Sequence, residues 1–216
     1  MLNKEQIQNL RRSYTSRQLN ESDILENPIE QFRVWFKEAV EAEVWEPNAM
    51  ILATANIDFK PSARVVLLKG IETDGFIFYT NYNSRKAKEL SWNPYACLVF
   101  LWHEVERQVR IEGRVEKVSR QESIEYFNSR PEESRIGAWA SPQSQEIENR
   151  VVLEKKIEEL TQAMRGTAIE CPEHWGGYKV IPYTIEFWQG RVNRLHDRIV
   201  YTAGSNGVWH KKRLAP

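Results

Sequence analysis

Hydrophobic and polar positions follow a helical period in the first part of this 216-residue chain and then change to a strand period. The helical period begins at Asn27-Pro28, an N-cap residue followed by proline at the first helical position, and continues to about Val44. Beyond it we expect strands at 49–55 and 63–68 around a turn near 58–61. The turn Thr73-Asp74-Gly75 then leads into a strand at 76–80.

The rest of the chain alternates short helices with further strands. A helix is expected at 84–92, and the capping box from Ser119 to Glu122 starts another, which Pro131 ends before a third helix runs to 139. The longest helical stretch is predicted at 146–164. Strands are expected at 95–102, 106–118, 184–189, 195–201 and 208–213.

Six or more strands in hairpin order, with helices inserted between them, indicate a mainly β fold: an antiparallel barrel with peripheral α-helices. A doubly wound α/β sheet fits less well, because strands and helices do not alternate and no GxGxxG motif is present. With no internal repeat and no Pro/Gly/Ser linker, we expect residues 1–216 to form a single domain.

Composition narrows the classes of function. Thirty basic residues balance thirty acidic ones, so no overall field favours nucleic acid or a membrane, and an anion must be held by a local cluster. The polar N-terminus has no signal-peptide core, and the longest apolar run, 96–102, is far shorter than a membrane span. Cys97 and Cys171 lie far apart without metal-ligand spacing, as expected of reduced thiols. We therefore expect a soluble, cytoplasmic protein without a bound metal.

Two clusters of basic residues depart from the usual preferences of helices and strands in ways that favour the binding of an anion. Arg85, Lys86 and Lys88 stand at a predicted helix N-terminus, whose partial positive charge opposes them unless an anion binds there; the alternative is a solvated basic patch. Arg64 and Lys69, five positions apart, point to opposite faces of a regular strand. They can serve one pocket only at a strand end or a bulge; otherwise they serve two neighbouring anions or reach solvent.

Two further groups are weaker signals. On a continuous strand Arg194, His196 and Arg198 share one face as a cationic stripe, with Leu195 and Asp197 on the other, although a solvated strand face explains the pattern as well. Tyr126, Arg130 and Ser134 are spaced by four, but Pro131 interrupts the helix, so they are expected to meet at a helix–helix junction.

Motifs of competing chemistry are absent: HExxH, the P-loop and GxSxG do not occur, and the basic clusters are not interleaved with aromatic residues as in a nucleic-acid groove. The residues alone thus predict a β-barrel protein with phosphate-competent cationic clusters, and they name no reaction.

A family resemblance goes further. The run from Ile185 to Gly190, followed by Arg194-Leu195-His196-Asp197-Arg198, resembles the signature of the FMN-dependent pyridoxine/pyridoxamine 5′-phosphate oxidases. The likeness covers nearly the whole chain and is loose only in the first several residues and around 165–173. It includes the segments 10–15, 64–69, 78–81, 84–87, 106–109, 126–131, 136–139 and 213–216.

The resemblance implies a split β-barrel homodimer with FMN at the subunit interface. The family's FMN positions carry over to Arg64, Val65, Val66, Leu67, Leu68, Lys69, Tyr79, Thr80, Arg85 and Lys86, and from elsewhere in the dimer to Gln108, Gln143, Ser144, Trp188 and Arg198. The substrate positions carry over to Lys69, Tyr126, Arg130 and Ser134 around the phosphate and to Arg194, Leu195 and His196 at the pyridine ring. Arg11 and Tyr14 match an N-terminal segment, 1–20, that closes over the substrate.

The implied reaction is oxidation of pyridoxamine 5′-phosphate and pyridoxine 5′-phosphate to pyridoxal 5′-phosphate, with O2 as acceptor and release of H2O2, in vitamin B6 biosynthesis or salvage. Arg194 and His196 are the candidate catalytic residues, and neither is assigned as the base. Two other functions remain open: a split-barrel flavoprotein acting on another substrate, and a non-catalytic protein that stores FMN or pyridoxal phosphate.

Overall fold

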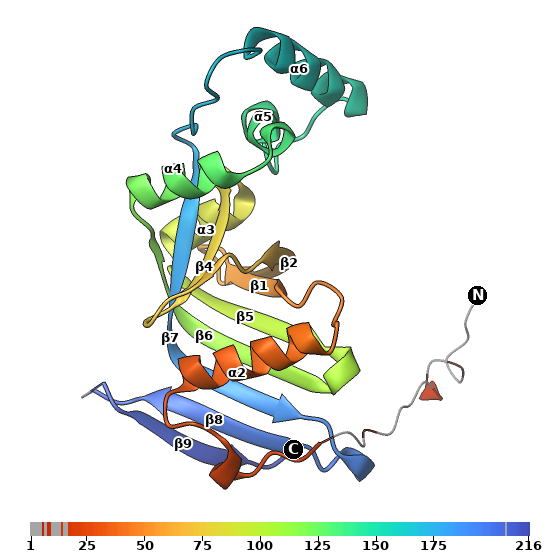
Figure 1. Cartoon of the computed structure of the whole chain (residues 1–216), viewed down its shortest axis with the longest axis vertical. Helices are drawn as coiled ribbons and strands as arrows, with labels where there is room; N and C mark the ends of the chain where they lie inside the picture. Colours follow the sequence, from red (N-terminus) through yellow and green to blue (C-terminus); the bar gives the residue numbers. More distant parts are fainter. Residues whose placement is uncertain (1–5, 7, 10–13, 15–16, 206) are drawn as a thin grey trace. The chain divides into compact units, whose positions relative to one another are not determined.

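The computed structural model describes residues 6, 8, 9, 14, 17–205 and 207–216 (Figure 1). Contacts divide the chain into two compact units. Unit 1 comprises 1–47, 99–111 and 183–216, and unit 2 comprises 48–98 and 112–182. The single domain expected over 1–216 stays a prediction. No helix among the described residues combines the length and the apolar character of a membrane span.

The described residues form nine strands in one sheet, and every pairing with a defined register is antiparallel. The mainly β, antiparallel fold class expected from the sequence is thereby confirmed. The strand order is β2 (Pro61–Leu67), β1 (Ala49–Ala55), β5 (Tyr95–Trp102), β6 (Arg107–Lys117), β7 (Trp175–Gln189), β4 (Phe76–Asn81) and β3 (Gly70–Ile71), with β8 (Asp197–Ala203) beside β7 and β9 (Trp209–Leu214) beside β8.

Unit 1 is built around helix α2 (Pro28–Glu41) (Figure 1). Asn27 caps it as predicted, since its side chain accepts hydrogen bonds from the N–H groups of Ile29 and Glu30. The ring centroid of Phe32 lies 4.9 Å from that of Phe100, which fixes the helix on the sheet. The helix ends three residues before the predicted Val44, because Glu43 adopts a left-handed backbone with φ 54°.

Unit 2 carries α3 (Arg85–Trp92), α4 (Arg120–Ser129), α5 (Glu132–Ala140) and α6 (Arg150–Ala163). Ser84 caps α3, and Ser119 caps α4 by accepting from the N–H of Glu122, as the capping box predicted. Helix α6 begins four residues later than expected, because the side chain of Asn149 caps the first turn there. At 14 residues it equals α2, so the expectation that it is the longest helix was wrong.

Strand β7 begins at Trp175, nine residues before the strand predicted at 184–189. Two features explain why the sequence did not predict the first part of this strand. Gly176 and Gly177 are poor strand formers, yet glycine is required at Gly177 because a Cβ there would lie 2.8 Å from the Tyr79 ring. Pro182 falls between the residues that pair with β4, which end at Val180, and those that pair with β8, which begin at Thr184.

Candidate functional site

Unit 2 contains a cavity of about 620 Å³ whose wall is formed by β2, β4, the start of α3, the α4–α5 junction and the residues after α5. Most of the predicted cofactor residues line it: Arg64, Val65, Val66, Leu67, Lys69, Tyr79, Thr80, Lys86 and Gln143. The predicted substrate-phosphate residues Tyr126, Arg130 and Ser134 line the same cavity. Predicted residues that are up to 79 positions apart in the sequence therefore share one wall.

Arg64 and Lys69 reach this cavity together because β2 ends at Leu67. Lys69 thus lies beyond the strand and escapes the alternation that would have placed it on the opposite face. Of the arrangements that the sequence left open, the one at a strand end is found. The interpretation that the two cations lie on opposed faces is corrected accordingly.

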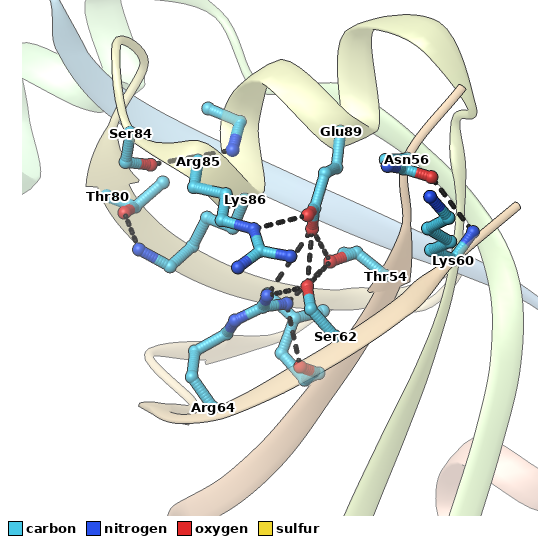
Figure 2. A network of polar contacts seen from close by, with 12 residues as sticks. Thr54, Asn56, Lys60, Ser62, Arg64, Thr80, Ser84, Arg85, Lys86 and Glu89 are labelled. Carbon is cyan, nitrogen blue, oxygen red and sulfur yellow. Dashed lines mark hydrogen bonds and ion pairs between the residues drawn. The ribbon is translucent and has the colours of Figure 1, made fainter. Parts of the chain in front are cut away.

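Next to the guanidinium of Arg64 lies a carboxylate that sequence reasoning missed (Figure 2). Glu89 of α3 is 2% exposed and accepts hydrogen bonds from the hydroxyls of Thr54 and Ser62. Its Oε2 lies 3.4 Å from Nη2 of Arg64, and its Oε1 accepts from Nε of Arg85 at 2.9 Å. Burial alone would raise the pKa of Glu89, but these hydrogen bonds and the charge of Arg64 hold the pKa at about 2.

Lys86 contributes a cation that forms no ion pair with a carboxylate in the part of the chain the structure describes. Its Nζ donates to Oε1 of Gln143 at 2.8 Å and to Oγ1 of Thr80 at 3.2 Å. Burial, assisted by the charge of Arg64, lowers the pKa of Lys86 to about 8. Helix α3 has no acidic residue in its first turn, so this end of the cavity wall is suited to an anion.

The second group on the wall lies where α4 gives way to α5. Arg130 is the C-cap of α4, Pro131 follows it, and Ser134 lies in the first turn of α5, which is the helix–helix junction expected from the sequence. The ring of Tyr126 stacks on that of Tyr79 with centroids 4.0 Å apart.

Arg130 packs against an aromatic residue that the sequence did not single out. Its guanidinium lies 4.7 Å from the ring centroid of Trp175, a cation–π distance. Its Nη1 atom is buried and has no hydrogen-bond partner among the described residues. Burial lowers the pKa of this guanidinium, so the group lacks the compensation that a bound anion would give.

Unit 1 gathers a second set of predicted residues around an imidazole. The His196 ring lies 4.5 Å from Trp188 and 5.6 Å from Tyr14, measured between centroids. The backbone N–H of Arg191 donates to Nδ1 of His196 at 3.1 Å, so the neutral ring carries its proton on Nε2. Burial and the charge of Arg194 lower the pKa of His196, which favours that neutral form.

The cationic stripe predicted for Arg194, His196 and Arg198 was wrong as a strand face. Strand β8 begins only at Asp197, and Arg194 has a left-handed backbone with φ 61° at the end of the 3-10 helix Val192–Arg194. Of the three, only Arg198 lies in the strand, where Nε and Nη2 donate to the two carboxylate oxygens of Glu186.

The remaining predicted residues are dispersed. Gln108 lies half-buried in β6 and Leu195 is 68% exposed, both in unit 1. In unit 2, Leu68 is buried, Arg85 bonds to Glu89, and Ser144 is exposed with φ 70°; none of them is among the described residues that line the cavity. Arg11 lies outside the described residues. The described residues contain no group of three or more His, Cys, Asp or Glu side chains arranged to hold a metal.

Comparison with known proteins gives two matches to family models along the chain. Residues 36–163 match the family model described as pyridoxamine 5′-phosphate oxidase. Residues 175–216 match the model described as the pyridoxine 5′-phosphate oxidase C-terminal dimerisation region. Together the two matches span most of the chain, including every described residue assigned above except Tyr14.

Individual relatives support the same assignment. Proteins named pyridoxine/pyridoxamine 5′-phosphate oxidase are 55% identical in Leptospira interrogans, over 97% of this chain and 98% of the relative, and 54% identical in Acaryochloris marina, over 97% and 95%. The solved structure of PhzG from Burkholderia lata, in complex with tetrahydrophenazine-1-carboxylic acid, is 32% identical, with a TM-score of 0.86 over 92% of this chain and 98% of that one. An FMN-binding protein from Nostoc punctiforme shares the fold at 17% identity, with a TM-score of 0.70 over 86% and 97%.

Proposed function

The chain belongs to the pyridoxine/pyridoxamine 5′-phosphate oxidase family, and from this premise we propose that it is an FMN-dependent oxidase that produces pyridoxal 5′-phosphate. Its substrates would be pyridoxamine 5′-phosphate and pyridoxine 5′-phosphate, with O2 as acceptor and H2O2 as a product. Oxidation of the amine also consumes water and releases ammonia. The observation that carries the proposal is the unit 2 cavity, whose wall bears two separate groups of anion-binding side chains.

The first group fits the phosphate of FMN. Lys86 is half-buried and forms no ion pair with a carboxylate among the described residues. It stands in the first turn of a helix that contains no acid there. A phosphate would supply the missing negative charge and accept from free N–H groups of that turn. FMN, when bound, supplies the acceptor that takes two electrons from the substrate and passes them to dioxygen.

The other cofactor assignments extend this proposal along the chain. They are Arg64, Val65, Val66, Leu67, Leu68, Lys69, Tyr79, Thr80, Arg85, Gln143 and Ser144 in unit 2, and Gln108, Trp188 and Arg198 in unit 1.

The second group fits the phosphate of the substrate. Arg130 offers a buried, unpaired Nη1, and Tyr126 and Ser134 offer hydroxyls on the same wall, so a phosphate would receive both charge and directed donors. Lys69 adds a further cation. Binding the phosphate in this way orients the rest of the substrate, which contributes to the rate through positioning.

Residues of unit 1 would act on the pyridine ring. We assign the guanidinium of Arg194 to holding the ring and the Nε2–H of His196 to donating a hydrogen bond to a ring substituent, since Nδ1 already accepts from Arg191. Arg11 and Tyr14 would belong to the segment that closes over the substrate. No residue is assigned as the base.

The proposed assembly is a homodimer with FMN at the subunit interface, and the name of the C-terminal dimerisation region supports self-association. The cytoplasmic location expected from the sequence is part of the same proposal.

The decisive experiment is an aerobic assay of the purified, FMN-loaded protein with pyridoxamine 5′-phosphate, following aldehyde and peroxide together. Both products in equal amounts are expected. Pyridoxamine without its phosphate is the matched control, because it cannot engage Arg130, and it should react far more slowly. An FMN-bound protein that forms neither product would reject the oxidase and favour a storage protein or an enzyme with another substrate. An aromatic carboxylic acid should be assayed in the same way, because PhzG was solved with such a ligand.

A further inference from the structure

A single buried carboxylate lies among the cations at the start of α3 (Figure 2). Glu89 is 2% exposed, whereas its hydrogen-bond partner Arg85, four residues earlier on the same helix, has a side chain that is 65% exposed. Burial lowers the pKa of both Arg64 and Lys86, and neighbouring charges lower it further: Arg85 acts on Arg64, and Arg64 acts on Lys86. Glu89 opposes both effects.

Two hydroxyls connect Glu89 to Arg64. Thr54 and Ser62 each donate their only hydroxyl hydrogen to Oε2 of Glu89. With their lone pairs the same hydroxyls accept from Arg64, Thr54 from Nη1 at 2.6 Å and Ser62 from Nη2. The direction of both bridges is therefore set by the carboxylate, because a hydroxyl that donates to Glu89 can only accept from Arg64.

This arrangement gives the two guanidiniums different tasks. The four terminal N–H bonds of Arg64 are taken up by the carbonyl of Leu52, Thr54, Ser62 and Glu89, so Arg64 offers the cavity its charge and its Nε–H. Arg85 is bound through Nε alone, and no described residue accepts from its Nη1 or Nη2. These two amino groups form the planar fork that binds a phosphate through two parallel hydrogen bonds.

We propose that Glu89 is a positioning residue of the cofactor site, which holds Arg64 and Arg85 in the orientation that recognises the phosphate of FMN. This inference rests on the proposed function, in which the phosphate lies at the start of α3. Glu89 touches neither FMN nor substrate in this proposal. It acts through the two arginines, and its charge reduces the repulsion between them.

The direction in which FMN affinity changes when Glu89 is replaced distinguishes a positioning role from a purely electrostatic one. Removing the charge of Glu89 makes the site more positive, which by Coulomb attraction alone would tighten the binding of an anion. Loss of position would weaken it instead. Glu89→Gln keeps the length of the side chain but has only one acceptor oxygen. In the wild-type protein the surrounding donors bind to both carboxylate oxygens of Glu89. Glu89→Asp keeps the charge but is one methylene too short to reach both Arg85 and the hydroxyls.

The test compares FMN with riboflavin, which has the same ring system without the phosphate, by titrating each into the apoprotein and following flavin fluorescence. The ratio of the two dissociation constants isolates the contribution of the phosphate. Glu89→Gln should reduce the preference for FMN by about tenfold, the loss expected for one charge-assisted hydrogen bond, and Glu89→Asp should reduce it as well. Riboflavin affinity should change little in either variant.

Glu41→Gln is the matched control, because Glu41 also pairs with a cation four residues earlier on its helix, Lys37, but is exposed to solvent. It should leave the preference unchanged. Equal losses of FMN and riboflavin affinity in Glu89→Gln would show that Glu89 serves only the fold, and an unchanged or stronger FMN preference would show that it does not position the arginines; either result overturns the inference.

Two further results keep the test decisive. If Glu89→Gln does not fold, Ser62→Ala removes one bridge while leaving the carboxylate in place, and the inference then requires a smaller loss of the FMN preference. A wild-type protein that binds FMN no more tightly than riboflavin would reject the phosphate site of the proposed function itself. If instead the wild-type protein prefers FMN and the variants keep this preference, only the role of Glu89 is rejected, and the phosphate site stands.

Discussion

Burial makes the charge of Lys86 depend on pH in the range of ordinary assays, because it lowers the pKa of this amine to about 8. The ammonium form is present below that pKa and is lost above it, and only this form attracts a phosphate. FMN affinity should therefore fall by up to about tenfold as the pH rises from about 7 to about 9. Lys86→Arg, which stays charged throughout, should flatten this dependence. Fluorescence titrations of FMN at several pH values measure both effects, and an equal slope in the two proteins would contradict the assignment.

Arg194 is the second side chain whose proposed role can be isolated. It is exposed and has no hydrogen-bond partner among the described residues, so its removal should cost the fold little. Arg194→Ala should lower kcat/KM for pyridoxamine 5′-phosphate by about a hundredfold, because the ring is then no longer held in place. FMN affinity should be retained, and Arg194→Lys tests whether charge alone is sufficient. Full activity of Arg194→Ala would refute the role.

These two side chains could be identified from the sequence, whereas Glu89 and Trp175 could not. An acid four residues after Arg85 reads as an ordinary solvent-exposed helix pair. Its burial depends on Thr54 and Ser62, which come from two strands earlier in the chain. Trp175 likewise contacts Arg130 from 45 positions away. Long-range packing of this kind leaves no periodic pattern in the sequence.

A side-chain cap begins both α2 and α3, but only the first turn of α3 contains proposed cofactor residues. Ser84→Ala and Asn27→Ala should each lower the free energy of unfolding by about 1 kcal/mol, the usual cost of losing a cap. Only Ser84→Ala should also weaken FMN binding, because its turn holds Arg85 and Lys86. Denaturant unfolding and FMN titration of both variants measure the two effects separately. Equal FMN affinities would mean that the α3 turn does not form part of the cofactor site.

Elements with local signals were predicted well, and those fixed by distant partners were not. The caps at Asn27, Ser84 and Ser119 act within three residues, so the starts of α2, α3 and α4 could be recognised. The start of β7 could not, because its glycines are explained by the close approach of side chains from distant parts of the chain, among them Tyr79 and Tyr82. The strand expected at 195–201 begins two residues late, at Asp197, for a related reason: left-handed residues such as Arg194 carry no clear signal when they are not glycine.

The residues proposed to bind FMN and the region proposed for self-association overlap along the chain. The region that matches the family's C-terminal dimerisation region, 175–216, contains β7, β8 and β9. Trp188 of β7 and Arg198 of β8, two of the proposed FMN residues, lie within it and pair directly in the sheet. If FMN binds at the subunit interface, occupancy of the site and formation of the dimer must be thermodynamically linked.

The linkage is reciprocal, so the factor by which FMN strengthens the dimer equals the factor by which dimer formation strengthens FMN binding. We expect saturating FMN to lower the dimer dissociation constant at least about tenfold, which corresponds to the usual range of coupling energies. Sedimentation velocity over a dilution series, with and without FMN, measures it. Identical dissociation constants with and without FMN would mean that the cofactor lies within one subunit, and the assignment of Trp188 and Arg198 to a shared site would then fail.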